Sequence, residues 1–354
     1  MKRLLASKGT LRPRTLDCLK QSSFGLLLLL FLSGSAGGAT ISLDPTAVRA
    51  AAEYSVRHRG VSFLAIQDGR TLLEQNAKTP HKIYSGTKAF WNLAALAAAQ
   101  DGLIDLDESV ADTIAGWRSD SRKAQVTIRQ LLDFDSGLEP LFSLQQTQAG
   151  DRDAAAIQAR IVAEPGSAFI YGPAALQVFH KVFKSKLRDQ TATHFLEHRV
   201  LHRLGLGPQR YLPDRAGNPV LATGWILTAR QWAKIGRVVL DDGAPLISRK
   251  SLEQSWRGTE ANRAFSLGWW NNRAAANGRE VDVEQMLIPK WPNQDWRDAC
   301  LCRDAPTDLV ACVGSEGQRL YVIPSLKLIV VRQANGGSFS DAHFLGLLVG
   351  RQRR

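Results

Sequence analysis

The sequence predicts an α+β fold, in which a central antiparallel sheet is formed from both ends of the chain and is flanked by helices. Strand patterns at residues 61–66 and 71–75 are joined by the turn sequence Asp68-Gly69, which indicates a hairpin. A second hairpin is predicted at residues 320–331. Most segments between the two hairpins have helical periodicity, so we expect an all-helical lobe inserted into the sheet.

The composition is that of a globular protein with a large core. Of the 354 residues, 44% are hydrophobic and 22% are charged, which suits a domain of one or two lobes. The formal net charge is +12, but beyond residue 39 the basic residues are interspersed with acidic ones. Because the chain lacks a block of lysine and arginine, we expect no nucleic-acid partner.

The first 39 residues have the features of an export signal. Basic residues precede an apolar run at 24–32, and the small residues 33–39 offer cleavage after Ala36 or Ala39. The run is too short to span a bilayer as a helix, and no later stretch is suited to do so. We therefore expect a signal peptide at 1–39, no stable membrane insertion, and a periplasmic or secreted protein; the alternative is a retained N-terminal anchor.

Helical segments dominate the middle of the chain. Asp44 is a predicted N-cap followed by Pro45, at the start of a helix at 46–59. The run at 92–100 is rich in alanine and leucine and has no proline or glycine, so it is predicted to be helical. The remaining predicted elements are helices at 126–132, 153–164, 173–187, 191–204, 228–240 and 340–350, a strand at 265–271 and an irregular stretch at 272–308.

Ser85 and Lys88 form a Ser-x-x-Lys pair at the start of the predicted 92–100 helix. Residues three apart in a helix share one face, one turn from each other. A lysine there can take the serine's proton or stabilise its alkoxide, and the positive helix end acts in the same direction. The same pattern also arises by chance, and Ser85 would then be an N-cap and Lys88 a surface residue.

Longer segments follow this pair in a fixed order. Residues 127–138 read Thr-Ile-Arg-Gln-Leu-Leu-Asp-Phe-Asp-Ser-Gly-Leu, and residues 165–171 read Pro-Gly-Ser-Ala-Phe-Ile-Tyr. With residues 102–110, 222–236 and 317–331, these segments make the chain resemble the class C β-lactamase-like serine hydrolases. That family includes penicillin-binding carboxypeptidases, esterases and aminohexanoate-oligomer amidases.

The resemblance covers nearly the whole chain after the predicted signal peptide. It implies a β-lactamase/transpeptidase-like serine hydrolase domain at residues 40–354. The sheet lobe would comprise about 40–84 and 225–354, and the helical lobe about 85–224.

The resemblance also implies catalytic roles. Ser85 would be the nucleophile, Lys88 its activator, and Tyr171 the partner base or a proton relay. A cationic Lys88 would favour the phenolate form of Tyr171. The oxyanion hole would consist of the Ser85 N–H and one N–H from the strand before Gly317, near residues 312–314.

By the same resemblance, Gly314, Ser315 and Gly317 would bind substrate. Two features depart from the family pattern. Pro173 stands where many relatives have asparagine, and the Lys-Thr-Gly motif has no copy in residues 309–318. A lysine in that motif normally helps to hold a substrate carboxylate. Its absence argues against β-lactam hydrolysis and cell-wall peptide trimming, and favours the esterase and amide-hydrolase branch.

Four tryptophans lie in or beside the irregular stretch: Trp269, Trp270, Trp291 and Trp296. Binding clefts favour aromatic side chains, and we expect Trp269 and Trp270 in particular to contact substrate. The alternative is that these two belong to a strand and pack into the core.

Three histidines fall at i, i+4 and i+8 of one predicted helix, a spacing that can bind a metal: His194, His198 and His202. Such spacings are also common on polar helix faces. The helix is peripheral in the resemblance, so we expect no metal site and no cofactor.

The cysteines are few. Cys18 would leave with the signal peptide, and Cys300, Cys302 and Cys312 would remain. Cys300 and Cys302 are too close in sequence to bridge each other comfortably. We expect one disulfide from Cys312 to either of them, which would hold the tryptophan-bearing loop near the active site; the alternative is three buried free thiols.

The sequence therefore predicts an exported serine hydrolase that cleaves a small-molecule ester, amide or peptide through an acyl-enzyme on Ser85. One alternative is a penicillin-binding D-peptidase or β-lactamase. Another is a catalytically inactive homologue that only binds ligands.

Overall fold

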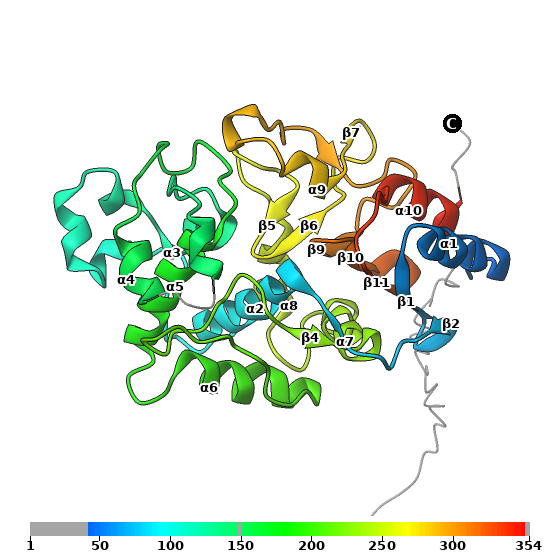
Figure 1. Cartoon of the computed structure of the whole chain (residues 1–354), viewed down its shortest axis with the longest axis horizontal. Coiled ribbons are helices and arrows are strands. Elements are labelled where there is room, and N and C mark those ends of the chain that lie inside the picture. The colour runs from blue at the N-terminus through cyan, green and yellow to red at the C-terminus, as the bar shows by residue number, and fades with distance from the viewer. Residues whose placement is uncertain (1–41, 147–149, 351–354) are drawn as a thin grey trace, which may run out of the picture. The chain divides into compact units, whose positions relative to one another are not determined.

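A seven-stranded antiparallel sheet organises the computed structural model, which describes residues 42–146 and 150–350 (Figure 1). The predicted signal peptide and Cys18 lie outside the described residues. The strands follow one another across the sheet in the order β2 (Arg70–Gln75), β1 (Gly60–Gln67), β11 (Leu328–Ala334), β10 (Gln318–Ile323), β9 (Val310–Gly314), β6 (Trp269–Asn271) and β5 (Phe265–Ser266). Because β1 pairs with β11, the sheet is built from both ends of the chain, and the predicted α+β fold is confirmed.

The two faces of the sheet are covered by helices that come from both ends of the chain and from its middle. Phe344 of α10 (Asp341–Val349) stacks on Tyr321 of β10 with ring centroids 5.6 Å apart. Val322, which follows Tyr321 in β10, points to the opposite face of the sheet, where it contacts Gly236 of α7 (Ala229–Leu240). The helix α1 (Pro45–Arg57), capped by Asp44 as predicted, packs beside α10 (Figure 1).

Helix α2 (Thr87–Gln100) lies between the sheet and the inserted helices (Figure 1). Twelve of its residues, 87–98, are buried, which explains why the run is apolar on every side. Helices α6 (Ala192–Leu196) and α8 (Arg249–Leu252) contact α2, whereas α3 (Ile128–Asp133) and α4 (Arg152–Ile157) pack on α5 (Pro173–Lys186). None of the helices among the described residues is long and apolar enough to cross a membrane.

Two predicted elements are shorter than expected. The helix predicted at 153–164 ends at Ile157, because residues 161 and 162 instead pair in extended form with residues 137 and 138. The strand predicted at 265–271 is a hairpin of β5 and β6. Leu267 and Gly268 form its turn, with positive φ angles of 44° and 83°.

The stretch predicted to be irregular, 272–308, is held together by short elements. Strands β7 (Arg279–Glu280) and β8 (Ala299–Cys300) pair in parallel, and α9 (Val283–Met286) lies between them in sequence. A further small pair joins β3 (His81–Lys82) to β4 (Ile226–Leu227). The amide of buried Asn272 donates to three backbone carbonyls, those of residues 302, 305 and 306, so this side chain fixes the far end of the stretch.

The predicted disulfide is wrong. Cys300, Cys302 and Cys312 are free and buried. Cys312 is an interior residue of β9, paired with Leu320, whereas Cys300 belongs to the separate small sheet. The Cys302 thiol instead lies 3.6 Å from the Ala342 carbonyl oxygen. Burial raises the pKa of the Cys300 and Cys302 thiols to about 11, so both are uncharged at neutral pH.

Candidate active site

Ser85 lies in a single helical turn, η1 (Tyr84–Gly86), that leads directly into α2. The turn is fixed from both sides. The Ile83 N–H donates to the Trp225 carbonyl oxygen at 3.0 Å. A Cβ atom on Gly86 would lie 2.6 Å from the indole of Trp232, so only glycine allows the start of α2 to rest on that ring. Ser85 therefore stands at the helix start, as predicted.

Lys88 is buried one turn further along α2, with only 2% of its surface exposed. Its Nζ donates to Ser85 Oγ at 2.8 Å and to the Ala222 carbonyl oxygen at 2.7 Å. Burial lowers the pKa of Lys88 to about 7, because the charged ammonium loses its hydration in the interior. At neutral pH a large fraction of Lys88 is thus uncharged and able to accept a proton.

Tyr171 reaches the same point from the loop that precedes α5. Its ring packs on Phe134, with centroids 4.7 Å apart, and Lys88 Nζ lies 4.7 Å from the centre of the Tyr171 ring. Burial raises the pKa of Tyr171 above its ordinary value, and a hydrogen bond with Ser85 only partly opposes this. The expected phenolate is therefore not favoured, because desolvation of its charge outweighs the hydrogen bond with Ser85.

The end of strand β9 abuts the segment that carries Ser85. A Cβ atom on Gly314 would lie 2.2 Å from the Ile83 carbonyl oxygen, so glycine is required for the backbones to approach this closely. Ser315, the next residue, lines the same cavity as Ser85 and Tyr171. Of the three predicted substrate-binding residues near this turn, Ser315 lines the cavity. Gly314 instead allows the end of β9 to lie against the backbone of Ile83.

Gly317 has a different environment. Its N–H donates to Glu284 Oε1 at 2.9 Å, so that N–H is already used. The same carboxylate oxygen accepts from Arg319 Nη1 at 2.8 Å, and Arg319 also donates to the Gly314 carbonyl oxygen at 3.1 Å. Arg319 is in turn paired with buried Asp341 at 2.7 Å. These buried contacts hold both ends of the 314–317 turn and link it to α9.

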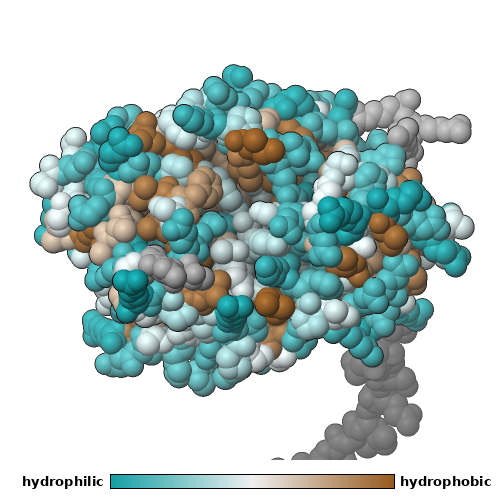
Figure 2. Space-filling model, viewed as in Figure 1, coloured by the Kyte–Doolittle hydropathy of each residue, from teal (hydrophilic) through white to brown (hydrophobic). Residues whose placement is uncertain are grey.

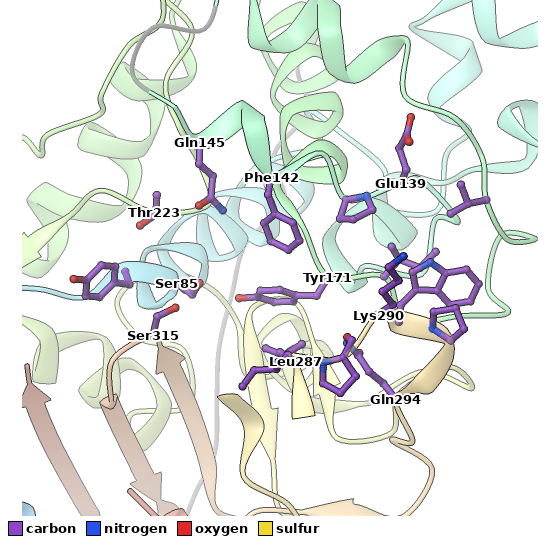
Figure 3. A pocket seen from close by; sticks show the side chains of 18 of the residues that line it. Ser85, Glu139, Phe142, Gln145, Tyr171, Thr223, Leu287, Lys290, Gln294 and Ser315 are labelled. Carbon is purple, nitrogen blue, oxygen red and sulfur yellow. The ribbon is translucent and has the colours of Figure 1, made fainter. Parts of the chain in front are cut away.

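A cavity of about 710 Å³ opens beside Ser85. Figure 3 shows Tyr171 between Ser85 and Lys290. Phe142 and Leu287 lie on opposite sides of the Tyr171 ring. The lining comprises Tyr84, Ser85, Glu139, Pro140, Phe142, Gln145, Arg160, Val162, Ile170, Tyr171, Thr223, Leu287, Ile288, Pro289, Lys290, Trp291, Pro292, Gln294 and Ser315. Sequence reasoning missed Gln145, Thr223 and Leu287, because they come from three separate segments that only the fold brings together.

Trp269 and Trp270 do not reach this cavity. They are 0% and 2% exposed in β6, and Trp270 packs on Trp296 with ring centroids 5.0 Å apart. The expectation that these two side chains contact substrate is therefore wrong. They pack into the core, where large aromatic side chains are usually found. Trp291 does line the cavity.

The motif at residues 127–138 has a structural role next to the site: it begins α3 and connects it to the β5–β6 hairpin. Thr127 and Gln130 form a capping box at the start of α3. At the end of α3, the buried Asp133 carboxylate accepts from Ser266 Oγ at 2.9 Å and from the Leu267 N–H at 2.8 Å. Burial raises the pKa of Asp133 to about 6. The motif thus ties the helical part to the β5–β6 hairpin.

The three histidines stack along one helical face. The rings of His194 and His198 have centroids 4.2 Å apart, and those of His198 and His202 are 4.8 Å apart. Within residues 42–146 and 150–350, no cluster of three or more His, Cys, Asp or Glu side chains is arranged to hold a metal ion.

A serine beside a buried lysine and a tyrosine, at the junction of a helical part and an antiparallel sheet, defines a serine hydrolase of the β-lactamase/transpeptidase-like fold. The sequence model of the family named Beta-lactamase matches residues 47–344, and the chain belongs to that family.

Individual relatives are distant. The 6-aminohexanoate-dimer hydrolase of Paenarthrobacter ureafaciens is 23% identical over 137 residues, which are 39% of this chain and 31% of that protein. A class C beta-lactamase from Rhodobacter sphaeroides has a similar structure, with a TM-score of 0.62, 20% identity, and coverage of 84% of this chain and 96% of that one. A family VIII carboxylesterase gives a TM-score of 0.60 at 17% identity, covering 87% and 98%. These structural likenesses confirm the fold.

Proposed function

We propose that this hydrolase cleaves an ester or amide through an acyl-enzyme formed on Ser85, with Lys88 as the base and Tyr171 as a proton relay. The observation that carries the proposal is the contact of 2.8 Å between Lys88 Nζ and Ser85 Oγ, made by a buried lysine. Burial lowers the pKa of Lys88 to about 7, which suits a base working near neutral pH.

In the proposed reaction, neutral Lys88 removes the proton of the Ser85 hydroxyl while Oγ attacks the substrate carbonyl carbon. The bond from that carbon to the leaving oxygen or nitrogen then breaks. Tyr171, protonated because burial raises its pKa, gives its proton to the leaving group and regains one from Lys88. Water attacks the acyl-enzyme in the second half, and its proton returns through the same groups as Ser85 is released.

The negative charge on the substrate oxygen needs hydrogen-bond donors. We assign this role to the Ser85 N–H and to one N–H at the end of β9, near Gly314. The close approach of Gly314 to Ile83 supports this assignment, since it brings the strand end beside the nucleophile turn. Gly317 is a poor candidate, because its N–H is bound to Glu284.

An ester or amide fits this site better than a β-lactam. The turn next to Ser315 carries no lysine, and its charged residue is the exposed acid Glu316. Burial and a hydrogen bond to Glu316 raise the pKa of Tyr84, a cavity residue, to about 12. The turn therefore offers no side-chain cation to a substrate carboxylate. Two of the similar proteins are named as a family VIII carboxylesterase and a 6-aminohexanoate-dimer hydrolase, and the first of these names supports an ester substrate.

We also propose that the protein is exported, with residues 1–39 as the signal. The basic start, the apolar run at 24–32 and the small residues that follow support this proposal. N-terminal sequencing of the protein recovered from the periplasm or the medium tests it. A start near residue 37 or 40 is expected, whereas an intact N-terminus in the cytoplasm would contradict export.

Labelling with an activated phosphonate tests the acyl-enzyme itself. The phosphonate should modify Ser85, as mapped by mass spectrometry, and Ser85→Ala should abolish labelling while the thermal unfolding temperature is preserved. Ser315→Ala is the matched control, because it removes a hydroxyl from the same cavity and should still be labelled. An adduct on another serine, or no adduct at all, would rule out the proposed nucleophile; the latter would favour a ligand-binding homologue.

A further inference from the structure

Three exposed apolar side chains line the wall of the cavity beside Ser85. Within the described part of the chain, the exposed large apolar residues are Val56, Leu72, Leu103, Phe142, Val162, Ile226 and Ile288. Three of these line the cavity that holds Ser85. Two of the three, Ile288 and Phe142, are the most exposed of all, at 72% and 57%. A wall of this kind beside a catalytic centre needs a reason other than folding, since these side chains remain in water.

The wall is assembled from three separate segments. Phe142 begins the short helix η5 (Phe142–Gln145), Val162 belongs to the extended pairing after α4, and Ile288 follows α9. Half-buried Leu287 and buried Ile170 continue the apolar lining toward Tyr171. In Figure 2 an apolar patch lies over the segment that follows α9, with further apolar atoms on the neighbouring helical part. The apolar surface is thus continuous with the catalytic end rather than isolated from it.

The charged residues that line the cavity are Glu139, Arg160 and Lys290. Glu139 and Arg160 form an ion pair at 2.9 Å and neutralise each other. Lys290 is exposed, so its ammonium can stay in water when an apolar group occupies the cavity. The size of the cavity, about 710 Å³, falls within the range of small-molecule sites, roughly 300–1,000 Å³. These features favour an uncharged, extended group as the occupant.

We propose that this wall, here called the apolar wall and made of Phe142, Val162 and Ile288, binds an extended alkyl or aryl group of the substrate. The inference rests on the proposed acyl-enzyme function and names its substrate class: esters or amides with a medium-length apolar chain. Covering the wall removes apolar surface from water on both partners, which supplies binding energy without any charged contact. Each methylene that becomes buried should raise kcat/KM by up to about fourfold.

Two series of substrates test the proposal with the purified protein. The first comprises p-nitrophenyl acetate, butyrate and octanoate, and the second comprises alkyl acetates of the same chain lengths, which place the chain on the leaving group. We expect kcat/KM to rise by more than about tenfold along at least one series, given the gain per buried methylene. Equal kcat/KM along both series would overturn the proposal.

Variants locate the effect. Ile288→Ser should reduce kcat/KM for the preferred long-chain ester by about tenfold, the equivalent of nearly two methylenes, and change that for the acetate less than twofold. Val56→Ser is the matched control, because Val56 is a β-branched side chain of similar exposure, 56%, on α1 outside the cavity. Phe142→Ser is the second variant. Both target side chains are exposed, so the thermal unfolding temperature should not change.

The outcomes separate this inference from the function on which it rests. If Ser85 is not labelled and no ester is cleaved, the proposed function fails. A second result is that acetate is cleaved and Ser85 is labelled, while Ile288→Ser lowers kcat/KM equally for esters of every chain length. That result would refute only the binding role of the apolar wall. A variant that changes the oligomeric state in solution while leaving chain preference intact would assign the wall to contact between two copies of the chain, and would also refute substrate binding.

Discussion

The carbonyl oxygen of Ala222 accepts a hydrogen bond from Lys88 Nζ at 2.7 Å. This contact holds the lysine from a second direction while Nζ also reaches Ser85. A neutral amine can donate to Ala222 and still offer its lone pair to the Ser85 hydroxyl, so the direction of the Ser85 hydrogen bond reverses when Lys88 loses its proton. In the proposed reaction, the protonation state of Lys88 therefore decides whether Ser85 can lose its proton.

Activity should depend on pH through Lys88. Its pKa is lowered by burial to about 7, and only the neutral form can accept the proton of Ser85. We expect kcat/KM for a p-nitrophenyl ester to be low at acidic pH and to rise to a plateau, with a midpoint near pH 7. A profile that is flat between pH 5 and pH 9, corrected for spontaneous hydrolysis, would contradict this assignment.

The same burial predicts a stability effect with a definite sign. Because the folded-state pKa of Lys88 is about 7 and its ordinary value is 10.5, the unfolded chain binds more protons than the folded one between these pH values. Titration of Lys88 should therefore increase the wild-type free energy of unfolding as pH rises across that window, by up to about 1.4 kcal/mol per pH unit. Below pH 7 the full destabilisation by the buried lysine remains.

Lys88→Met isolates this effect, since methionine is similar in length and does not titrate. We expect the variant's free energy of unfolding, relative to wild type, to be most favourable at and below pH 7 and to decline toward pH 10. Urea denaturation at several pH values measures the difference. A constant difference across this range would indicate that Lys88 keeps an ordinary pKa.

Tyr171→Phe removes the hydroxyl but keeps the ring that packs on Phe134. A proton relay typically contributes between 10² and 10⁴ in rate, so we expect a loss of about that size in kcat. Burst kinetics should show whether acylation or deacylation is slowed. Phe134→Leu is a packing control and should affect the unfolding temperature more than kcat. Turnover of the Tyr171 variant within twofold of wild type would exclude the relay.

Nitrocefin should be a poorer substrate than a p-nitrophenyl ester. The turn at Ser315 lacks the lysine that would bind the lactam carboxylate, and a charged hydrogen bond of that kind contributes about 1.5–3 kcal/mol. We expect kcat/KM for the ester to exceed that for nitrocefin by at least tenfold, measured under one set of conditions. The opposite preference would show that another cation, such as Lys290, holds the carboxylate.

Local patterns allowed much of the fold to be predicted. The hairpins β1–β2 and β10–β11 and the helix α7 follow from periodicity, turn residues and caps that lie within a few residues of one another. The β5–β6 hairpin was missed because Leu267 adopts a positive φ that its side chain does not favour. That conformation is enforced by the Leu267 N–H bond to Asp133, which is distant in sequence.

For the site, spacing along the chain was enough to predict the pair Ser85 and Lys88, because residues three apart on a helix face the same side. Tyr171 was predicted from its place at the end of the segment 165–171. The sequence could not determine protonation, since the pKa values of Lys88 and Tyr171 depend on burial by segments far along the chain. Ala222, for example, is 134 residues from Lys88.

Which side chains line the cavity, and which N–H groups are already hydrogen-bonded, depends on the packing of distant segments. The Gly317 N–H is bound to Glu284, and Trp269 is buried in the core, although their sequence positions gave no sign of either. The exposed wall formed by Phe142 and Ile288 likewise comes from segments almost 150 residues apart. Such long-range contacts depend on how the packed elements are arranged, whereas helix periodicity and caps are set by neighbouring residues.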